Sequence, residues 1–175
     1  MPLTRPNLRL ILAYIVIGLT TCTILLAILS ISTTHWVHSP RMRAGFWKLC
    51  HLEPLACFHS ITRSPAALSL TGLFLVVVGL ISTMIFDIID WHLSSSTHFI
   101  SFLSVVSLAF GAFFFAMSYV AFAHLAGQFC YSYYLMIVSQ LLAMSAAIVA
   151  SYLEGRRNAL VSTSVILSRL AVRRP

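Results

Sequence analysis

The stretch Trp36–Cys57 reads WVHSPRMRAGFWKLCHLEPLAC and follows directly on a long apolar run. It holds two of the three Trp and two of the four Cys in the chain. Six residues, one of them a proline, separate Cys50 from Cys57, and this spacing suits a hairpin closed by a disulfide. Trp36 and Trp47 supply bulky aromatic surface beside it. We therefore expect a small stiff hairpin between the first two apolar runs.

The composition outside this stretch is that of a membrane protein. Of 175 residues, 59% are hydrophobic and only 9% are charged, whereas soluble domains carry about 25% charged residues. A soluble fold of this size would lack the polar surface to cover itself, so we expect one compact domain embedded in the lipid bilayer. The net charge is +7, but no Lys or Arg lies between Arg63 and Arg156. The charges therefore form no single patch, and we do not expect nucleic-acid binding.

Four uncharged apolar runs predict four transmembrane helices, at residues 10–31, 66–86, 99–123 and 132–152. At about 1.5 Å per residue the first run is about 33 Å long, enough to cross a hydrocarbon core of about 30 Å. It is too long for the apolar region of a cleaved signal peptide, which has about 7–15 residues, so we expect a signal-anchor. We expect Gly155 to cap and end the last helix.

The loops and tails around these runs suggest how the chain is oriented. We expect an N-terminus at 1–9, a four-span domain at 10–153 with outer loops at 32–65 and 124–131, and a basic tail at 154–175. Seven Lys or Arg lie on the side of the termini and four on the other side. The positive-inside rule therefore predicts cytosolic termini. Cys50 and Cys57 would then face a compartment where disulfides form, which suits the plasma membrane.

Small and polar residues inside the runs predict how the helices pack. The fourth run carries a small residue every four positions, at Ser139, Ala143, Ala147 and Ser151. The third run has two pairs of small residues, Ser107 with Gly111 and Ala112 with Ala116. We interpret these as internal packing surfaces, with a dimer seam as the alternative. Gln140 is the one strongly polar side chain deep in a run, and we expect it to make an interhelical hydrogen bond.

The first loop also contains residues that could bind a metal. Cys and His are zinc ligands, and four histidines lie near the two cysteines: His35, His38, His51 and His59. Their spacing matches no standard zinc motif, so we favour a disulfide and expect no metal and no cofactor. No run contains Asp, Glu, His, Lys or Arg, and no nucleophile or phosphate-loop motif occurs. We therefore do not expect an enzyme.

The order of these features resembles the claudin, peripheral myelin protein and epithelial membrane protein superfamily. The family motif is a Trp after the first span, then Gly-Leu-Trp, then two Cys. Here the motif residues are Trp36, Gly45, Phe46 in place of Leu, Trp47, Cys50 and Cys57, and Arg63 stands where the family often has an Arg before its second span. The resemblance covers roughly residues 8–153 in order and topology, but only the first loop is specific.

The resemblance implies an all-α membrane fold, namely a left-handed bundle of four transmembrane helices that carries a small extracellular antiparallel β-sheet. The Trp residues and the disulfide would stiffen that sheet. Both outer loops are short for a protein that forms junction strands. The C-terminal residue, Pro175, is not the hydrophobic one that PDZ domains capture, so we expect no PDZ scaffold partner.

The resemblance favours a function in protein–protein contact. We expect a non-enzymatic protein that organises membranes or mediates cell adhesion through self-association or another membrane protein. The alternative is an auxiliary subunit of an ion channel or receptor, similar to the gamma subunits of calcium channels in the same superfamily. The first loop carries Arg41, Arg43, Lys48 and Arg63 against the single acid Glu53. We interpret it as a surface that docks an acidic partner, and an anion-selective pore lining is the alternative.

Overall fold

Four long helices dominate the computed structural model. It describes residues 5–33, 36–39, 42–45, 47–51, 56–59, 63–89, 97–123 and 128–172. The helices are α1 (Arg5–Ser32), α2 (Arg63–Ile89), α3 (Thr97–Ala123) and α4 (Tyr131–Val172). Each contains a segment long and apolar enough to cross a membrane, at Leu10–Ser32, Pro65–Ile85, Phe99–Ala123 and Tyr131–Arg156. These segments agree with the four predicted runs to within a few residues, as expected for a multi-pass membrane protein.

All four helices extend beyond the predicted runs, α1 and α4 by the most. Helix α1 begins at Arg5 rather than Leu10, with Pro6 in its first turn, where the missing N–H has no helical partner to lose. The prediction that Gly155 ends the last helix is wrong, because α4 continues to Val172. Gly155 does not have the left-handed backbone that a helix cap needs. A helical Gly costs only about 1 kcal/mol relative to Ala, and an existing helix extends readily through it.

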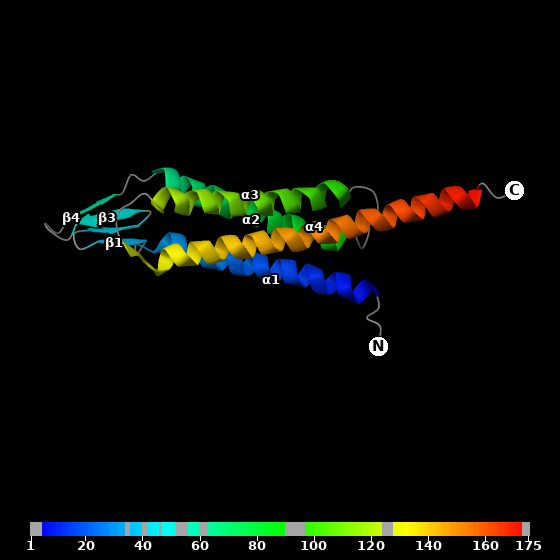
Figure 1. Ribbon diagram of the computed structural model, residues 1–175, viewed down its shortest axis with the longest axis horizontal. Helices are drawn as coiled ribbons and strands as arrows, with labels where there is room; N and C mark the ends of the chain where they lie inside the picture. Colours follow the sequence, from blue (N-terminus) through cyan, green and yellow to red (C-terminus); the bar gives the residue numbers. More distant parts are fainter. Residues whose placement is uncertain are drawn as a thin grey trace.

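The helices lie side by side, with a β-sheet at one end of the bundle (Figure 1). Helix α2 packs mainly on α3, and α1 packs mainly on α4. The start of α1 and the end of α4 both lie at the end opposite the sheet, and α4 reaches well past its neighbours (Figure 1). The sheet is therefore on one side of the apolar segments, and both ends of the described chain are on the other.

The sheet is antiparallel and takes strands from both loops on its side of the bundle. Its strands are β1 (Val37–Ser39), β2 (Met42–Ala44), β3 (Lys48–His51), β4 (Ala56–His59) and β5 (Gln128–Phe129). Their order is β4-β3-β2-β1-β5. The predicted hairpin is present as β3 and β4, and β5 joins the edge formed by β1. The loop between α3 and α4 is thus tied to the loop between α1 and α2.

The interior of the bundle combines apolar side chains with buried hydroxyl groups. Its fully buried apolar members include Val16, Val76, Leu108, Phe115 and Met136. Ser69 and Ser118 lie 2.5 Å apart between α2 and α3, and Ser118 donates to the carbonyl oxygen of Pro65. Further along, Thr83 Oγ1 donates to the carbonyl oxygen of Gly79 at 2.8 Å, and Ser104 Oγ lies 2.6 Å from Thr83 Oγ1 and 3.2 Å from the same carbonyl oxygen. Each of these four hydroxyls has a partner, as a bilayer without water requires.

Most of the small residues predicted to pack inside the bundle do so. Ser107, Gly111 and Ala112 of α3 are buried, Ala116 is half-buried, and Ser139, Ala143 and Ala147 of α4 are buried. Ser151 is exposed instead, and its hydroxyl donates to the carbonyl oxygen of Ile148. It lies in the lining of a groove between α3 and α4.

The closest approach of two helices is between α2 and α3. A Cβ atom added at Gly111 would lie 2.6 Å from Val76 Cγ2 and 3.1 Å from the carbonyl oxygen of Gly72. A Cβ atom added at Gly72 would meet the ring of Phe115 at 2.9 Å. Glycine is needed at this crossing because any side chain would force the two backbones apart.

We predict that Gly111→Ala lowers the thermal unfolding midpoint of the detergent-solubilised protein, because overpacking costs about 1–3 kcal/mol. Gly18→Ala is the matched control, because a Cβ atom there would meet nothing within 4 Å. The control should be neutral or slightly stabilising, since Ala is the better helix former. Equal midpoints for the two variants would contradict the close contact.

Candidate functional site

Trp36 connects the sheet to the helices. Its side chain is completely buried, and its indole Nε1 donates to the carbonyl oxygen of Ser30 at 2.9 Å. Its ring lies 4.8 Å from that of Phe122 in α3 and meets Tyr133 of α4 edge-on at 6.3 Å. This one side chain therefore contacts the end of α1, the end of α3 and the start of α4. It does so immediately before strand β1 begins. Trp36 is an internal anchor rather than an exposed contact residue.

Trp47 makes the same kind of hydrogen bond from a more exposed position. Its Nε1 donates to the carbonyl oxygen of Ile31 at 2.9 Å, while 42% of its side chain remains exposed. Ser30 and Ile31 belong to the last turn of α1, whose carbonyl groups have no partners within the helix. Two indole groups from the first loop therefore cap this helix end. The exposed part of the Trp47 ring is available to a partner or to lipid headgroups.

The second loop is fastened at the same place. The backbone N–H of Cys130 donates to the carbonyl oxygen of Trp36 at 3.0 Å. Ser30 Oγ donates to the carbonyl oxygen of Ser132 at 2.7 Å, and the rings of Phe129 and Tyr133 stack 4.2 Å apart. These contacts join the end of α1, strand β5 and the start of α4. The sheet therefore has a fixed position on the helices.

The strand register divides the sheet into an apolar row and a polar row. The apolar row is Phe129, Val37, Ala44, Leu49 and Phe58, each opposite the next. The polar row is Gln128, His38, Arg43, Cys50 and Cys57. Adjacent rows lie on opposite faces of a sheet. Among the members whose side chains are described, Val37 of the apolar row is only 1% exposed, whereas Gln128 of the polar row is exposed.

The predicted basic residues are only partly within the described structure. Arg43 is in the polar row, and Lys48 belongs to the same face because it lies two residues before Cys50 in β3. Arg63 is the first residue of α2 and belongs to no strand. Gly45 is buried between β2 and β3. Arg41, His35 and Phe46 lie outside the residues that the structure describes.

The four cysteines fall into two groups. Cys50 and Cys57 are direct register partners in the antiparallel strands β3 and β4. Residues paired in this way have Cα atoms about 4.5 or 5.5 Å apart, and both values fall in the range of about 4.4–6.8 Å that a disulfide spans. Cys22 and Cys130 are free thiols. Within the part of the chain that the structure describes, no group of three or more His, Cys, Asp or Glu is placed to hold a metal.

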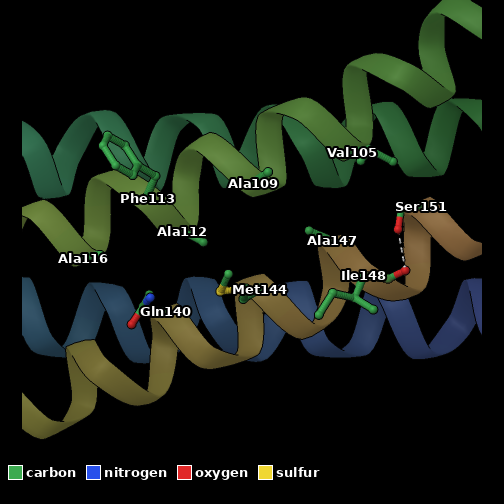
Figure 2. Close-up of a pocket in the computed structure, with 10 residues that line it drawn as sticks. All are labelled: Val105, Ala109, Ala112, Phe113, Ala116, Gln140, Met144, Ala147, Ile148 and Ser151. Carbon is green, nitrogen blue, oxygen red and sulfur yellow. Dashed lines mark hydrogen bonds between the residues drawn. The ribbon is translucent and has the colours of Figure 1, made fainter.

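A groove of about 360 Å³ lies between α3 and α4, within their apolar segments (Figure 2). Its lining is mostly small and apolar, and it is formed by Val105, Ala109, Ala112, Phe113, Ala116, Gln140, Met144, Ala147, Ile148 and Ser151. The amide oxygen of Gln140 accepts a hydrogen bond from Tyr119 Oη of α3 at 3.1 Å. The predicted interhelical hydrogen bond of Gln140 is therefore confirmed. The groove itself had no signal in the sequence, because it depends on how far α3 and α4 separate.

Comparison with known proteins adds no further assignment, because no protein-family model and no curated protein matches this sequence. The site is therefore defined by its own residues. It consists of a two-faced sheet held on the helix ends by Trp36, and of an apolar groove between two helices.

We predict that Trp36→Ala destabilises the folded protein by about 3–5 kcal/mol, because the change empties a fully enclosed site. Trp47→Ala should cost clearly less, because its ring is partly exposed. The free energy of unfolding, measured by SDS titration in mixed micelles, distinguishes the two. An effect at Trp47 as large as that at Trp36 would contradict the anchor role of Trp36.

Proposed function

We propose that this protein is a non-enzymatic, claudin-like four-span protein of the plasma membrane. It acts through protein–protein contacts in membrane organisation or cell adhesion, and the exposed face of its sheet makes those contacts. The observation that carries this proposal is the two-faced sheet. The strand register supports it: Val37 is buried, and Arg43 pairs with His38, which pairs with the exposed Gln128, while Lys48 lies two residues before Cys50 in β3.

Several features support the family part of this proposal. The family motif residues Trp36, Trp47 and Gly45 lie where the first strands meet the end of α1. The bundle carries a small antiparallel sheet at one end, as the resemblance implies. We further propose that the helices form a left-handed bundle and that the sheet is extracellular. Arg5 and Arg156, which lie toward the opposite end, are consistent with cytosolic termini under the positive-inside rule.

We also propose that a disulfide joins Cys50 to Cys57 and holds the β3–β4 hairpin. The register pairing of the two residues supports it, and so does the free state of Cys22 and Cys130. In the chain-entropy model, a bridge that closes a loop of this length stabilises the fold by about 2.5 kcal/mol.

Non-reducing mass spectrometry of the protein from intact cells should therefore recover a peptide that links Cys50 to Cys57, with Cys22 and Cys130 unlinked. Cys57→Ser should lower stability and surface delivery, because loss of such a bridge typically costs about 2–5 kcal/mol. Recovery of both hairpin cysteines as free thiols at the cell surface would contradict the disulfide.

The basic face of the sheet predicts a partner with acidic groups, bound with a salt-dependent rate. Replacing two surface cations by anions should abolish binding of that partner at physiological salt. We therefore expect Arg43→Glu with Lys48→Glu to lose a membrane-protein partner that the wild type retains in affinity purification from mild detergent. Arg156→Glu with Arg157→Glu is the matched control, because it makes the same charge change beyond the opposite end of the bundle.

The identity of the recovered protein then decides the role. Copies of the same chain or adhesion proteins support the proposed contact function. Pore-forming channel or receptor subunits would assign the chain an auxiliary role instead. If both double variants retain the same partners as the wild type, the sheet face is not the docking surface.

A further inference from the structure

Gln140 is positioned deep within the membrane-spanning part of α4. It lies nine residues after Tyr131, where the helix begins, which corresponds to about 14 Å along the axis. The hydrocarbon core is about 30 Å thick, so Gln140 lies near its middle. Its amide lines the groove between α3 and α4 (Figure 2). A polar side chain at this depth is costly unless it is hydrogen-bonded.

The hydrogen bonding of this amide is incomplete. A Gln side chain has two N–H donors and a carbonyl oxygen with two lone pairs. Among the residues that the structure describes, Tyr119 is its one partner, and that bond uses a single lone pair of the oxygen. Both N–H donors and the second lone pair are therefore left to whatever fills the groove. Lipid acyl chains offer neither donors nor acceptors at this depth.

We propose that a second copy of this chain occupies the groove, forming a two-fold symmetric dimer in which the two Gln140 side chains hydrogen-bond to each other. An amide is self-complementary, because the N–H donor of one copy meets the free lone pair of the other in both directions. A two-fold contact places the same residue of each copy at the axis. This pairing uses the free lone pair and one of the two N–H donors of each amide, and it is independent of the sheet face proposed above.

The shape of the surface also suits a self-complementary contact. Met144 and Ile148 line the groove and are 53% and 65% exposed, so they project from α4 beside it. Opposite them, α3 contributes the small residues Ala109, Ala112 and Ala116. One face therefore carries both a ridge of large side chains and a hollow with small ones. Two copies related by a two-fold axis can place each ridge in the other's hollow, as close packing in lipid requires.

Cysteine cross-linking tests the position of the contact. In full-length protein with Cys22→Ser and Cys130→Ser, reconstituted in lipid vesicles, we expect Met144→Cys to form a disulfide-linked dimer on mild oxidation. Phe74→Cys on α2 is the control, since Phe74 is 67% exposed but does not line the groove. Equal cross-linking at the two positions, or none at Met144→Cys, would overturn the proposal.

The role of the amide is tested by measuring the dimer dissociation constant in the same vesicles. Fluorescence energy transfer between labelled copies is followed as the protein is diluted in lipid. Gln140→Leu should weaken the dimer by about threefold to twentyfold for each of the two hydrogen bonds that it removes, the range that an interhelical hydrogen bond in a membrane supports. Tyr119→Phe removes the internal bond but keeps the amide, so it should leave dimer formation intact. An equal loss in both variants would mean that the effect passes through the fold of the monomer, and it would overturn the proposal.

The remaining outcomes concern other occupants of the groove. A wild-type protein that stays monomeric at every dilution and retains a lipid in native mass spectrometry would assign the groove to that lipid. Cross-linking of Met144→Cys in cells to a different protein, with no homodimer, would assign it to a partner helix. Either result overturns the dimer and leaves the sheet-face function untouched.

Discussion

The position of the sheet depends on hydrogen bonds to the last carbonyl groups of α1. A helix end in or near lipid must find donors for its last carbonyl groups, and water is scarce there. Here the indole N–H groups of Trp36 and Trp47 supply them. Because both residues belong to the first loop, capping the helix also fixes where the first strands begin. Indole groups suit this role because they combine one strong donor with a large apolar surface.

Helix α3 approaches α2 more closely than it approaches α4 along the groove. Toward α2 it meets glycines, and Gly72 and Gly111 allow the two backbones into direct contact. Toward α4 a groove remains, lined in part by Met144 and Ile148, which stay largely exposed. The hydroxyl pairs between α2 and α3 tighten the first interface further. The α2–α3 interface is therefore closely packed, whereas the groove between α3 and α4 leaves room for a molecule or helix in the membrane.

The sequence predicted the parts of the fold that depend on local composition. Runs without charge identify the four helices, and the spacing of Cys50 and Cys57 identifies the hairpin. The hydrogen bond of Gln140 was also predictable, because a lone polar group in lipid needs a partner. The pairing of β5 with β1 was not, since a strand of two residues has no periodicity and its partner is far along the chain. The end of α4 was missed because a glycine was given too much weight as a helix breaker.

The groove and the two faces of the sheet lay beyond sequence reasoning for a different reason. Both depend on relations between segments, namely the separation of two helices and the register of four hydrogen-bonded strand pairs. A one-residue shift in register would exchange the faces and place Arg43 toward the helices. The basic character of the first loop was visible from its composition, but which of its cations share a face was not.

Helix α4 is one continuous helix that runs from the sheet past the opposite end of the bundle. Its 42 residues form a rod about 63 Å long that starts at the contacts with Ser30 and β5 and ends beyond the bundle. A tilt of about 5° at the sheet end would move the far end by about 5 Å, because a helix of this length transmits angle as displacement. A displacement at the sheet end would therefore be carried to the far end of the bundle by one continuous helix.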